Sequence, residues 1–401
     1  MNDRVITAPR SAAKPAARPS REELLERAAA LVPVLRERAA TAEALRHCPA
    51  ETVADLHARG LLRICQPARY GGYEHGWDVL CEVSQVLARG CASQAWVGNI
   101  YNDHSQMLGM FDIRAQDDVW GDNPDARLSA AIEPVGKARP VAGGVVYSGR
   151  HRYSSGIDHV HWVLCGGHMH EDGKAPRRCF FLVPKAAATV IDDWHVIGLA
   201  GTGSKSFAVE DLFVPAHRIL DGDASDEGTG PGTDVNTAPV FRIPRHDIAG
   251  TGFAAIAVGV AEGFIEEYLA YTRTRTSRGE AVAQLMGTQI GLGHAAVEVR
   301  AAQQICIDGA RQAMAVLARG ERLSRRQRQH TRLASSYAAQ LALAAVQRLF
   351  NAAGGRALFT DNAMQRLMRD LYAVAAHRGL AWDAAAAGYG AILLGSDGAA
   401  P

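Results

Sequence analysis

The stretch 159–165, HVHWVLC, distinguishes the middle of this 401-residue chain, because its side chains alternate with a period of two. One face of such a strand carries Val160, Trp162 and Leu164, and the other carries His161, Val163 and Cys165. Similar runs occur at 145–149, 179–183, 188–191 and 207–214, separated by Gly, Pro and Asp. Short strands at this spacing predict a β-sandwich or barrel over residues 126–235.

The segments on both sides of this β domain have helical periodicity. Residues 21–125 predict an N-terminal helical domain, in which Ser20 and Glu23 form a capping box and later helices cover 77–89 and 93–111. Residues 236–401 predict an up-down four-helix bundle with helices at 254–276, 282–319, 324–353 and 362–387. Residues 1–20, rich in Ala, Pro, Ser and Arg, are expected to be a disordered tail. The predicted fold class is mainly α with a central β domain.

Composition excludes several classes of protein. Hydrophobic residues make up 48% of the chain and charged residues 21%, as in soluble globular proteins. The net charge of +1 argues against a dedicated nucleic-acid binder. The seven cysteines are scattered without a C-x-x-C pair, which fits a reducing cytoplasm. The most apolar stretch, 249–264, is interrupted by Glu262 and several glycines, so we expect no membrane span.

A glycine-rich stretch at 198–206, GLAGTGSKS, superficially resembles a phosphate-binding loop. It is not a Walker A motif, because Lys205 does not directly follow Gly203, and no βαβ unit surrounds it. Two interpretations stay open. The stretch is either a turn between strands or a loop whose backbone amides and Thr202 and Ser204 hydroxyls approach a ligand.

The histidines admit both structural and functional interpretations. His104 follows Trp96 by eight residues on a predicted helix, so both side chains could line one groove. His377 is predicted in mid-helix among small residues, which leave room beside an imidazole. Four histidines share one hairpin without a completing carboxylate or cysteine, so we expect a solvated hairpin and no metal: His159, His161, His168 and His170. The adjacent hydroxyls of Ser154 and Ser155 either cap a turn or hydrogen-bond a planar heterocycle.

Several motifs, taken in order, carry a resemblance to a known family. They are QPARYGG at 66–72, RGCASQAWV at 89–97, YNDH at 101–104, WGDNPDAR at 120–127, SGRHRYSSG at 148–156, WHVIGLAGTGS at 194–204, VEDLFVP at 209–215, Arg369-Asp370, His377 and Tyr389-Gly390. Nearly the whole chain after residue 20 resembles the acyl-CoA dehydrogenase fold. More narrowly, it resembles the oxygenase components of two-component flavin monooxygenases, such as the p-hydroxyphenylacetate 3-hydroxylases and the seconandrostatrienedione hydroxylases.

This resemblance implies a reduced-flavin-dependent monooxygenase that hydroxylates a phenolic or polycyclic aromatic substrate through a flavin C4a-hydroperoxide. Reduced FMN or FAD would arrive by diffusion from a separate NAD(P)H:flavin reductase, and molecular oxygen would be the other reactant. The resemblance also implies a homotetramer whose cofactor sites straddle subunits. The composition adds the expectation of a cytoplasmic location, with neither nucleic acid nor membrane as a partner.

The resemblance also assigns roles to matched residues. The implied cofactor-binding residues are Trp96, Ser154, Ser155, Thr202, Ser204, Gly354, Gly355 and Arg356, the last three reaching the flavin phosphate from another subunit. The implied catalytic residues are Ser155 beside flavin N5, Arg242 near the reduced flavin anion, and His104 or His377 as the base at a phenol oxygen. The implied substrate contacts are Tyr101, His104, Ala130 and His377. Two departures from the family pattern are the missing hydroxyls at Ala130 and Ala131 and the large Arg356.

Three other functions remain open from the sequence. An N- or S-oxygenase on the same fold would need no phenol-directed base. An acyl-CoA dehydrogenase or oxidase would need a catalytic carboxylate, and Asp370 and Asp383 are the only acids across 369–390. A flavin-storage or scaffold protein would bind flavin without forming an oxygen adduct.

Overall fold

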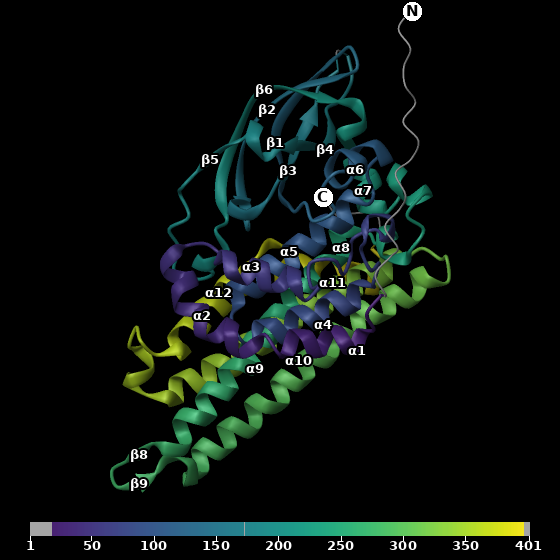
Figure 1. Ribbon diagram of the computed structural model, residues 1–401. Coiled ribbons are helices and arrows are strands. Elements are labelled where there is room, and N and C mark those ends of the chain that lie inside the picture. The colour runs from purple at the N-terminus through teal and green to yellow at the C-terminus, as the bar shows by residue number, and fades with distance from the viewer. Residues whose placement is uncertain (1–17, 172, 397–401) are drawn as a thin grey trace, which may run out of the picture.

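The computed structural model describes residues 18–171 and 173–396. A sheet stands at one end of a block of helices, and the longest helices run away from it (Figure 1). Most of the predicted tail at 1–20 lies outside the described residues, so its disorder stays a prediction.

The N-terminal part is helical, as predicted. Its α-helices are α1 (Arg21–Ala29), α2 (Val32–Leu45), α3 (Ala50–Ala58), α4 (Trp77–Ala88), α5 (Ala92–Leu108) and α6 (Ile113–Trp120). The expected capping box begins α1: the Ser20 hydroxyl accepts from the Glu23 N–H, and the Glu23 carboxylate accepts from the Ser20 N–H. Helix α5 is buried along its entire length, so its polar side chains must find partners within the protein.

One seven-stranded sheet forms the central domain, in the order β5-β6-β2-β1-β3-β4-β7. Its strands are β1 (Leu128–Val141), β2 (Gly144–Ser154), β3 (Trp162–Met169), β4 (Arg177–Pro184), β5 (Thr189–Ile191), β6 (Lys205–Pro215) and β7 (Ile219–Asp221). Strands β1 and β3 are parallel, and the other pairs are antiparallel. The sheet curls so far that Phe181 of β4 packs against Tyr147 of β2, with ring centroids 4.6 Å apart. This curl favours the barrel alternative over two stacked sheets.

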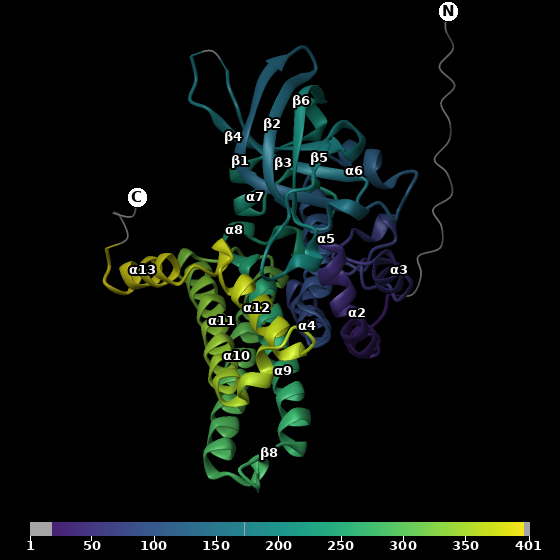
Figure 2. The same ribbon diagram turned by 90° about the vertical axis from the view of Figure 1, so that its left-hand side faces the viewer.

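The C-terminal part is a helical bundle with one correction to the prediction. Its main helices are α9 (Gly250–Thr274), α10 (Met286–Ala318), α11 (Arg325–Ala353), α12 (Ala363–Ala375) and α13 (Trp382–Leu393), preceded by the short α7 (Gly222–Glu227) and α8 (Arg245–Ile248). The single helix expected at 362–387 is two helices, and α13 projects away from the bundle (Figure 2). His377 therefore lies at the break and not in mid-helix. Its Nδ1 accepts from the Gly379 N–H at 3.1 Å and caps a short 3-10 turn.

Helix α9 runs through the centre of the bundle. The segment Arg245–Thr274 is long and apolar enough to cross a membrane, but 78% of its most apolar window is buried inside the protein, which is typical of a core helix. Two glycines one turn apart let α9 approach α4 closely. A Cβ at Gly259 would lie 2.0 Å from the Gln85 carbonyl oxygen, and one at Gly263 would lie 2.5 Å from that of Arg89.

Gly259→Ala should destabilise the fold, because the added methyl group forces α4 and α9 apart. We expect a loss of about 1–3 kcal/mol in the free energy of unfolding, measured by urea denaturation. Gly293→Ala on α10 is the matched control, since a Cβ there meets nothing within 4 Å. The control should be neutral or slightly stabilising, and equal effects of the two substitutions would contradict the close α4–α9 packing.

Candidate active site

A chain of buried hydrogen bonds lies where α5 meets the ends of β2 and β6. The indole Nε1 of Trp96 donates to Ser155 Oγ at 3.0 Å, and the Ser155 and Ser204 hydroxyl oxygens are 2.7 Å apart. The Ser204 hydroxyl is in turn 2.6 Å from Thr202 Oγ1. All four side chains are buried. The structure thus brings together four of the residues predicted to contact the cofactor, and we call them the hydroxyl chain.

A sharp turn after β2 presents Ser155 to this chain. Gly156 has φ +72°, a conformation that favours glycine, and a Cβ there would lie 2.7 Å from the Tyr101 hydroxyl. The Tyr101 hydroxyl donates to the Gly156 carbonyl at 2.7 Å, and the Gly156 N–H donates to the Thr202 carbonyl at 2.8 Å. Tyr101 therefore fixes the turn through its hydroxyl. Ser154 faces elsewhere, because its hydroxyl lies 2.7 Å from that of Ser129 on β1.

Aromatic rings pack against Trp96 beside the hydroxyl chain. Phe253 of α9 stacks on the indole with ring centroids 4.5 Å apart, and the His377 ring contacts Trp96 at 5.4 Å and Phe253 at 4.1 Å. The structure thus brings together His377 and Trp96, two residues predicted at the site, across nearly 300 residues of chain. Phe253 was not predicted, since within an apolar helical stretch its ring looks like any core residue.

His104 is buried on α5, two turns beyond Trp96, and its Nδ1 has no hydrogen-bond partner among the described residues. Burial lowers the pKa of His104 to about 4, although the Asp103 carboxylate opposes this shift. Burial also lowers the pKa of His377 to about 4. Both imidazoles are therefore neutral near pH 7. The predicted substrate contact Ala130 is buried on β1, two residues after Leu128, whose backbone interacts with His104.

A buried ion pair between Asp103 of α5 and Arg245 of α8 lies next to His104. Arg245 also donates to the Asp103 carbonyl at 3.2 Å and to Gln106 Oε1 at 2.5 Å. Arg242, the arginine predicted near the flavin, is exposed, and no contact in the described part of the chain joins it to this cluster. The arginine next to His104 in the single chain is Arg245, and the role of Arg242 stays a prediction. The sequence analysis did not single out Arg245.

The segment Gly354–Arg356 lies far from Trp96 within one chain. Arg275 donates to the carbonyl of Ala353 at 2.8 Å, so this segment adjoins the far end of α9. From Phe253 to Arg275, α9 extends about 33 Å at 1.5 Å per residue. Arg356 itself is paired with Asp361 at 2.6 Å. These three residues can reach a Trp96 site only from a second chain, which leaves their predicted role dependent on assembly.

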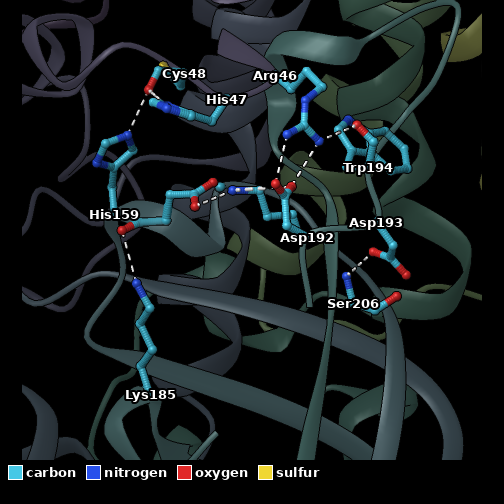
Figure 3. A network of polar contacts seen from close by, with 12 residues as sticks. Arg46, His47, Cys48, His159, Lys185, Asp192, Asp193, Trp194 and Ser206 are labelled. Atoms are coloured by element: carbon cyan, nitrogen blue, oxygen red, sulfur yellow. Dashed lines mark hydrogen bonds and ion pairs between the residues drawn. The ribbon is translucent and has the colours of Figure 1, made fainter. Parts of the chain in front are cut away.

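A polar network ties the sheet domain to the segment that follows α2 (Figure 3). Arg46 donates to both carboxylate oxygens of Asp192, at 2.8 and 2.7 Å, and the Asp193 carboxylate accepts from the Ser206 N–H at 2.9 Å. His159 is hydrogen-bonded to the Cys48 carbonyl oxygen at 2.7 Å. Across residues 18–171 and 173–396, no group of three His, Cys, Asp or Glu side chains is arranged to hold a metal ion.

Comparisons with known proteins agree with this geometry. The family model "Acyl-CoA dehydrogenase, C-terminal domain" matches residues 251–382. The flavin-dependent monooxygenase oxygenase subunit HsaA of Rhodococcus jostii (strain RHA1) is 33% identical over 356 residues, covering 88% of this chain and 93% of the relative. The FADH(2)-dependent resorcinol hydroxylase oxygenase component of Rhizobium sp. (strain MTP-10005) is 33% identical, with coverage of 96% and 97%. The chain belongs to the oxygenase components of flavin-dependent monooxygenases.

The fold of this oxygenase is also similar to solved structures. The structure of XiaF from Streptomyces sp. in complex with FADH2 and glycerol has a TM-score of 0.89 at 27% identity, covering 95% of this chain and 97% of XiaF. The donor set of the oxygenase suits a flavin ring. Hydroxyl groups can serve a heterocycle as donors or acceptors, and the free Nδ1 of His104 leaves one buried polar atom for a ligand. The individual cofactor contacts stay predictions.

Acid should destabilise the oxygenase through His104. Its pKa is lowered from 6.5 to about 4 on folding. Between these two pH values His104 is protonated in the unfolded chain but neutral in the folded chain. The free energy of unfolding therefore keeps its full value above pH 6.5. It falls by about 3 kcal/mol as the pH drops towards 4, because of this shift in pKa.

His104→Gln should make the fall in stability between pH 7 and 4.5 shallower in urea denaturation series, while His377, whose pKa is lowered in the same way, keeps its own contribution. His294→Gln removes an exposed histidine of α10 as the control. An unchanged slope in the His104 variant would show that His104 is not held neutral by burial.

Proposed function

We propose that this oxygenase hydroxylates an aromatic ring, ortho to a phenol, using molecular oxygen and reduced FMN or FAD that diffuses from a separate NAD(P)H:flavin reductase. The observation that carries the proposal is the hydroxyl chain from Trp96 to Thr202, buried beside two neutral imidazoles. Relatives named for aromatic substrates support it. They include the resorcinol hydroxylase and a p-hydroxyphenylacetate 3-hydroxylase oxygenase component of Acinetobacter baumannii at 28% identity.

Reduced flavin, when bound, would supply the chemistry that activates molecular oxygen. We propose that its ring is held by Trp96, Ser155, Ser204 and Thr202. The Ser155 hydroxyl is shared between the Trp96 N–H and Ser204, so its orientation is constrained before any ligand arrives. A preorganised donor in a buried site stabilises developing charge more strongly than water does. Burial around Trp96 and Phe253 also keeps water away from the reacting atoms.

The two histidines would have different roles at the phenol oxygen, one as a hydrogen-bond donor and the other as a proton acceptor. Nδ1 of His377 accepts from the Gly379 N–H, so the neutral ring carries its proton on Nε2 and offers a donor. We propose that this Nε2–H holds the phenol oxygen and stabilises its negative charge. His104 keeps Nδ1 free, and a neutral imidazole with a free nitrogen can accept the phenol proton.

We also propose a cytoplasmic homotetramer. Helix α10 exposes large apolar side chains, with Met286 75%, Ile290 65% and Val297 68% exposed. Only Ala385 is buried in α13, although most of that helix is apolar. Such surfaces are typical of subunit contacts. A second chain would also bring Gly354–Arg356 to the site. All seven cysteines are free and buried, which suits a reducing compartment.

Rapid mixing of oxygen with the protein and reduced FMN, followed by flavin absorbance, tests the proposed chemistry. We expect a transient spectrum that differs from both reduced and oxidised flavin and decays at least tenfold faster in Ser155→Ala, because the substitution removes the constrained hydroxyl. Asp223→Asn, at a carboxylate 95% exposed on α7, should match the wild type. Direct reoxidation to flavin and hydrogen peroxide, with either FMN or FAD, would contradict the proposal.

His377→Asn separates phenol hydroxylation from N- or S-oxygenation. Asparagine can still cap the turn at Gly379, but it removes the Nε2 donor. Hydroxylated product per NADH should fall at least tenfold in a phenol screen, while flavin reoxidation continues. A variant that oxygenates amines or sulfides as well as the wild type would favour the other oxygenase class.

A further inference from the structure

Helix α12 holds the loop from which the hydroxyl chain begins. The Leu199 N–H donates to Asp370 Oδ1 at 2.7 Å, and the Arg369 guanidinium donates to the Ile197 carbonyl. Between these contacts the backbones touch, since a Cβ at Gly198 would lie 2.2 Å from the Arg369 carbonyl oxygen. Three consecutive loop residues are therefore fixed on two consecutive helix residues.

The contact between α12 and the loop holds Leu199 in an unusual backbone conformation. Its φ of +56° lies in the left-handed region, which costs a leucine conformational energy and needs compensation from its surroundings. The Leu199 carbonyl accepts from Thr202 Oγ1 at 2.8 Å and from Trp194 Nε1 at 3.2 Å. Thr202 is also the first member of the hydroxyl chain that ends at Trp96. Asp370 therefore holds the peptide before Leu199, and the carbonyl of the peptide after Leu199 orients Thr202.

Asp370 is placed at an energetic cost. Its side chain is 6% exposed, and across the described residues it forms no ion pair within 4 Å. Burial raises its pKa to about 6, while the Leu199 N–H, Arg369 and Arg366 oppose the shift and Glu43 adds to it. An apolar side chain would fill this position at lower cost. Within the described residues, the hydrogen bond of this buried carboxylate goes to the Leu199 N–H of the loop.

We propose that Asp370 is a positioning residue, which holds Leu199 in its left-handed conformation and thereby aligns Thr202, Ser204 and Ser155 for the flavin ring. The proposal rests on the proposed function for the identity of the ligand. It also removes Asp370 as the catalytic base of a dehydrogenase, because its carboxylate serves a backbone amide and contacts neither His377 nor Trp96.

Hydrogen exchange of the flavin-free protein tests this positioning without any ligand. In Asp370→Ala, amides in 197–204 should exchange at least tenfold faster than in the wild type. Asp370→Asn keeps an acceptor oxygen for Leu199 and should stay within about twofold. Asp370→Leu, which suits an apolar pocket but offers no acceptor, replaces the alanine variant if that protein does not fold. Asp223→Asn is the exposed control.

The same variants are then titrated anaerobically with reduced FMN. We expect the dissociation constant to rise at least fivefold in Asp370→Ala or Asp370→Leu, with Asp370→Asn near the wild type. Unchanged exchange in a folded variant that lacks the acceptor would overturn the proposal, as would faster exchange with unchanged affinity. If the wild type binds no reduced flavin, the proposed function fails, and the exchange result still decides whether Asp370 holds the loop.

Discussion

A continuous run of buried hydrogen bonds joins the three parts of this chain. It starts at Asp370 in the bundle, passes through Leu199 and the hydroxyls of the sheet domain, and ends at Trp96 in the N-terminal helices. Each buried polar group left without its partner would cost about 1–3 kcal/mol. The positions of α5, α12 and the loop before β6 therefore depend on one another, and the site exists only where all three meet.

Close packing beneath this run determines the character of the site. Glycines let α9 press against α4, and the same helix carries Phe253 under the Trp96 ring. The resulting apolar surroundings keep His104 and His377 neutral, so the imidazoles can exchange hydrogen bonds with a phenol without first losing a proton. The charges next to His104, on Asp103 and Arg245, are paired with each other. Apolar surroundings with a few oriented donors suit a reaction whose intermediates water would otherwise destroy.

The sequence predicted the elements well, because local patterns determine them: a two-residue period for the strands, helical spacing for the bundle and a capping box before α1. The resemblance also identified Trp96, Ser155, Thr202 and Ser204, which the structure brings together. Residues that matter through contacts distant in sequence were missed. Arg245 looks like an ordinary surface charge in the sequence, and Asp370 was noted there without its role at the loop. Only the packing of α8 and α12 buries them. The sequence analysis predicted one helix across His377, because alanine-rich sequence with helical spacing lies on both sides of it. In the structure the helix ends before Gly379. The role of Gly354–Arg356 stays a prediction, because this segment adjoins the far end of α9 within one chain.

An anaerobic crystal structure with reduced FMN tests the central claim most directly, namely that the buried hydroxyl chain is the surface on which the flavin ring lies. The account predicts the isoalloxazine ring within hydrogen-bond distance of Ser155 Oγ, with the Asp370–Leu199 contact intact. It also predicts the His104 and His377 rings facing the substrate side of the flavin. A ring bound elsewhere, with the Trp96–Ser155–Ser204–Thr202 hydrogen bonds closed to ligand, would contradict it.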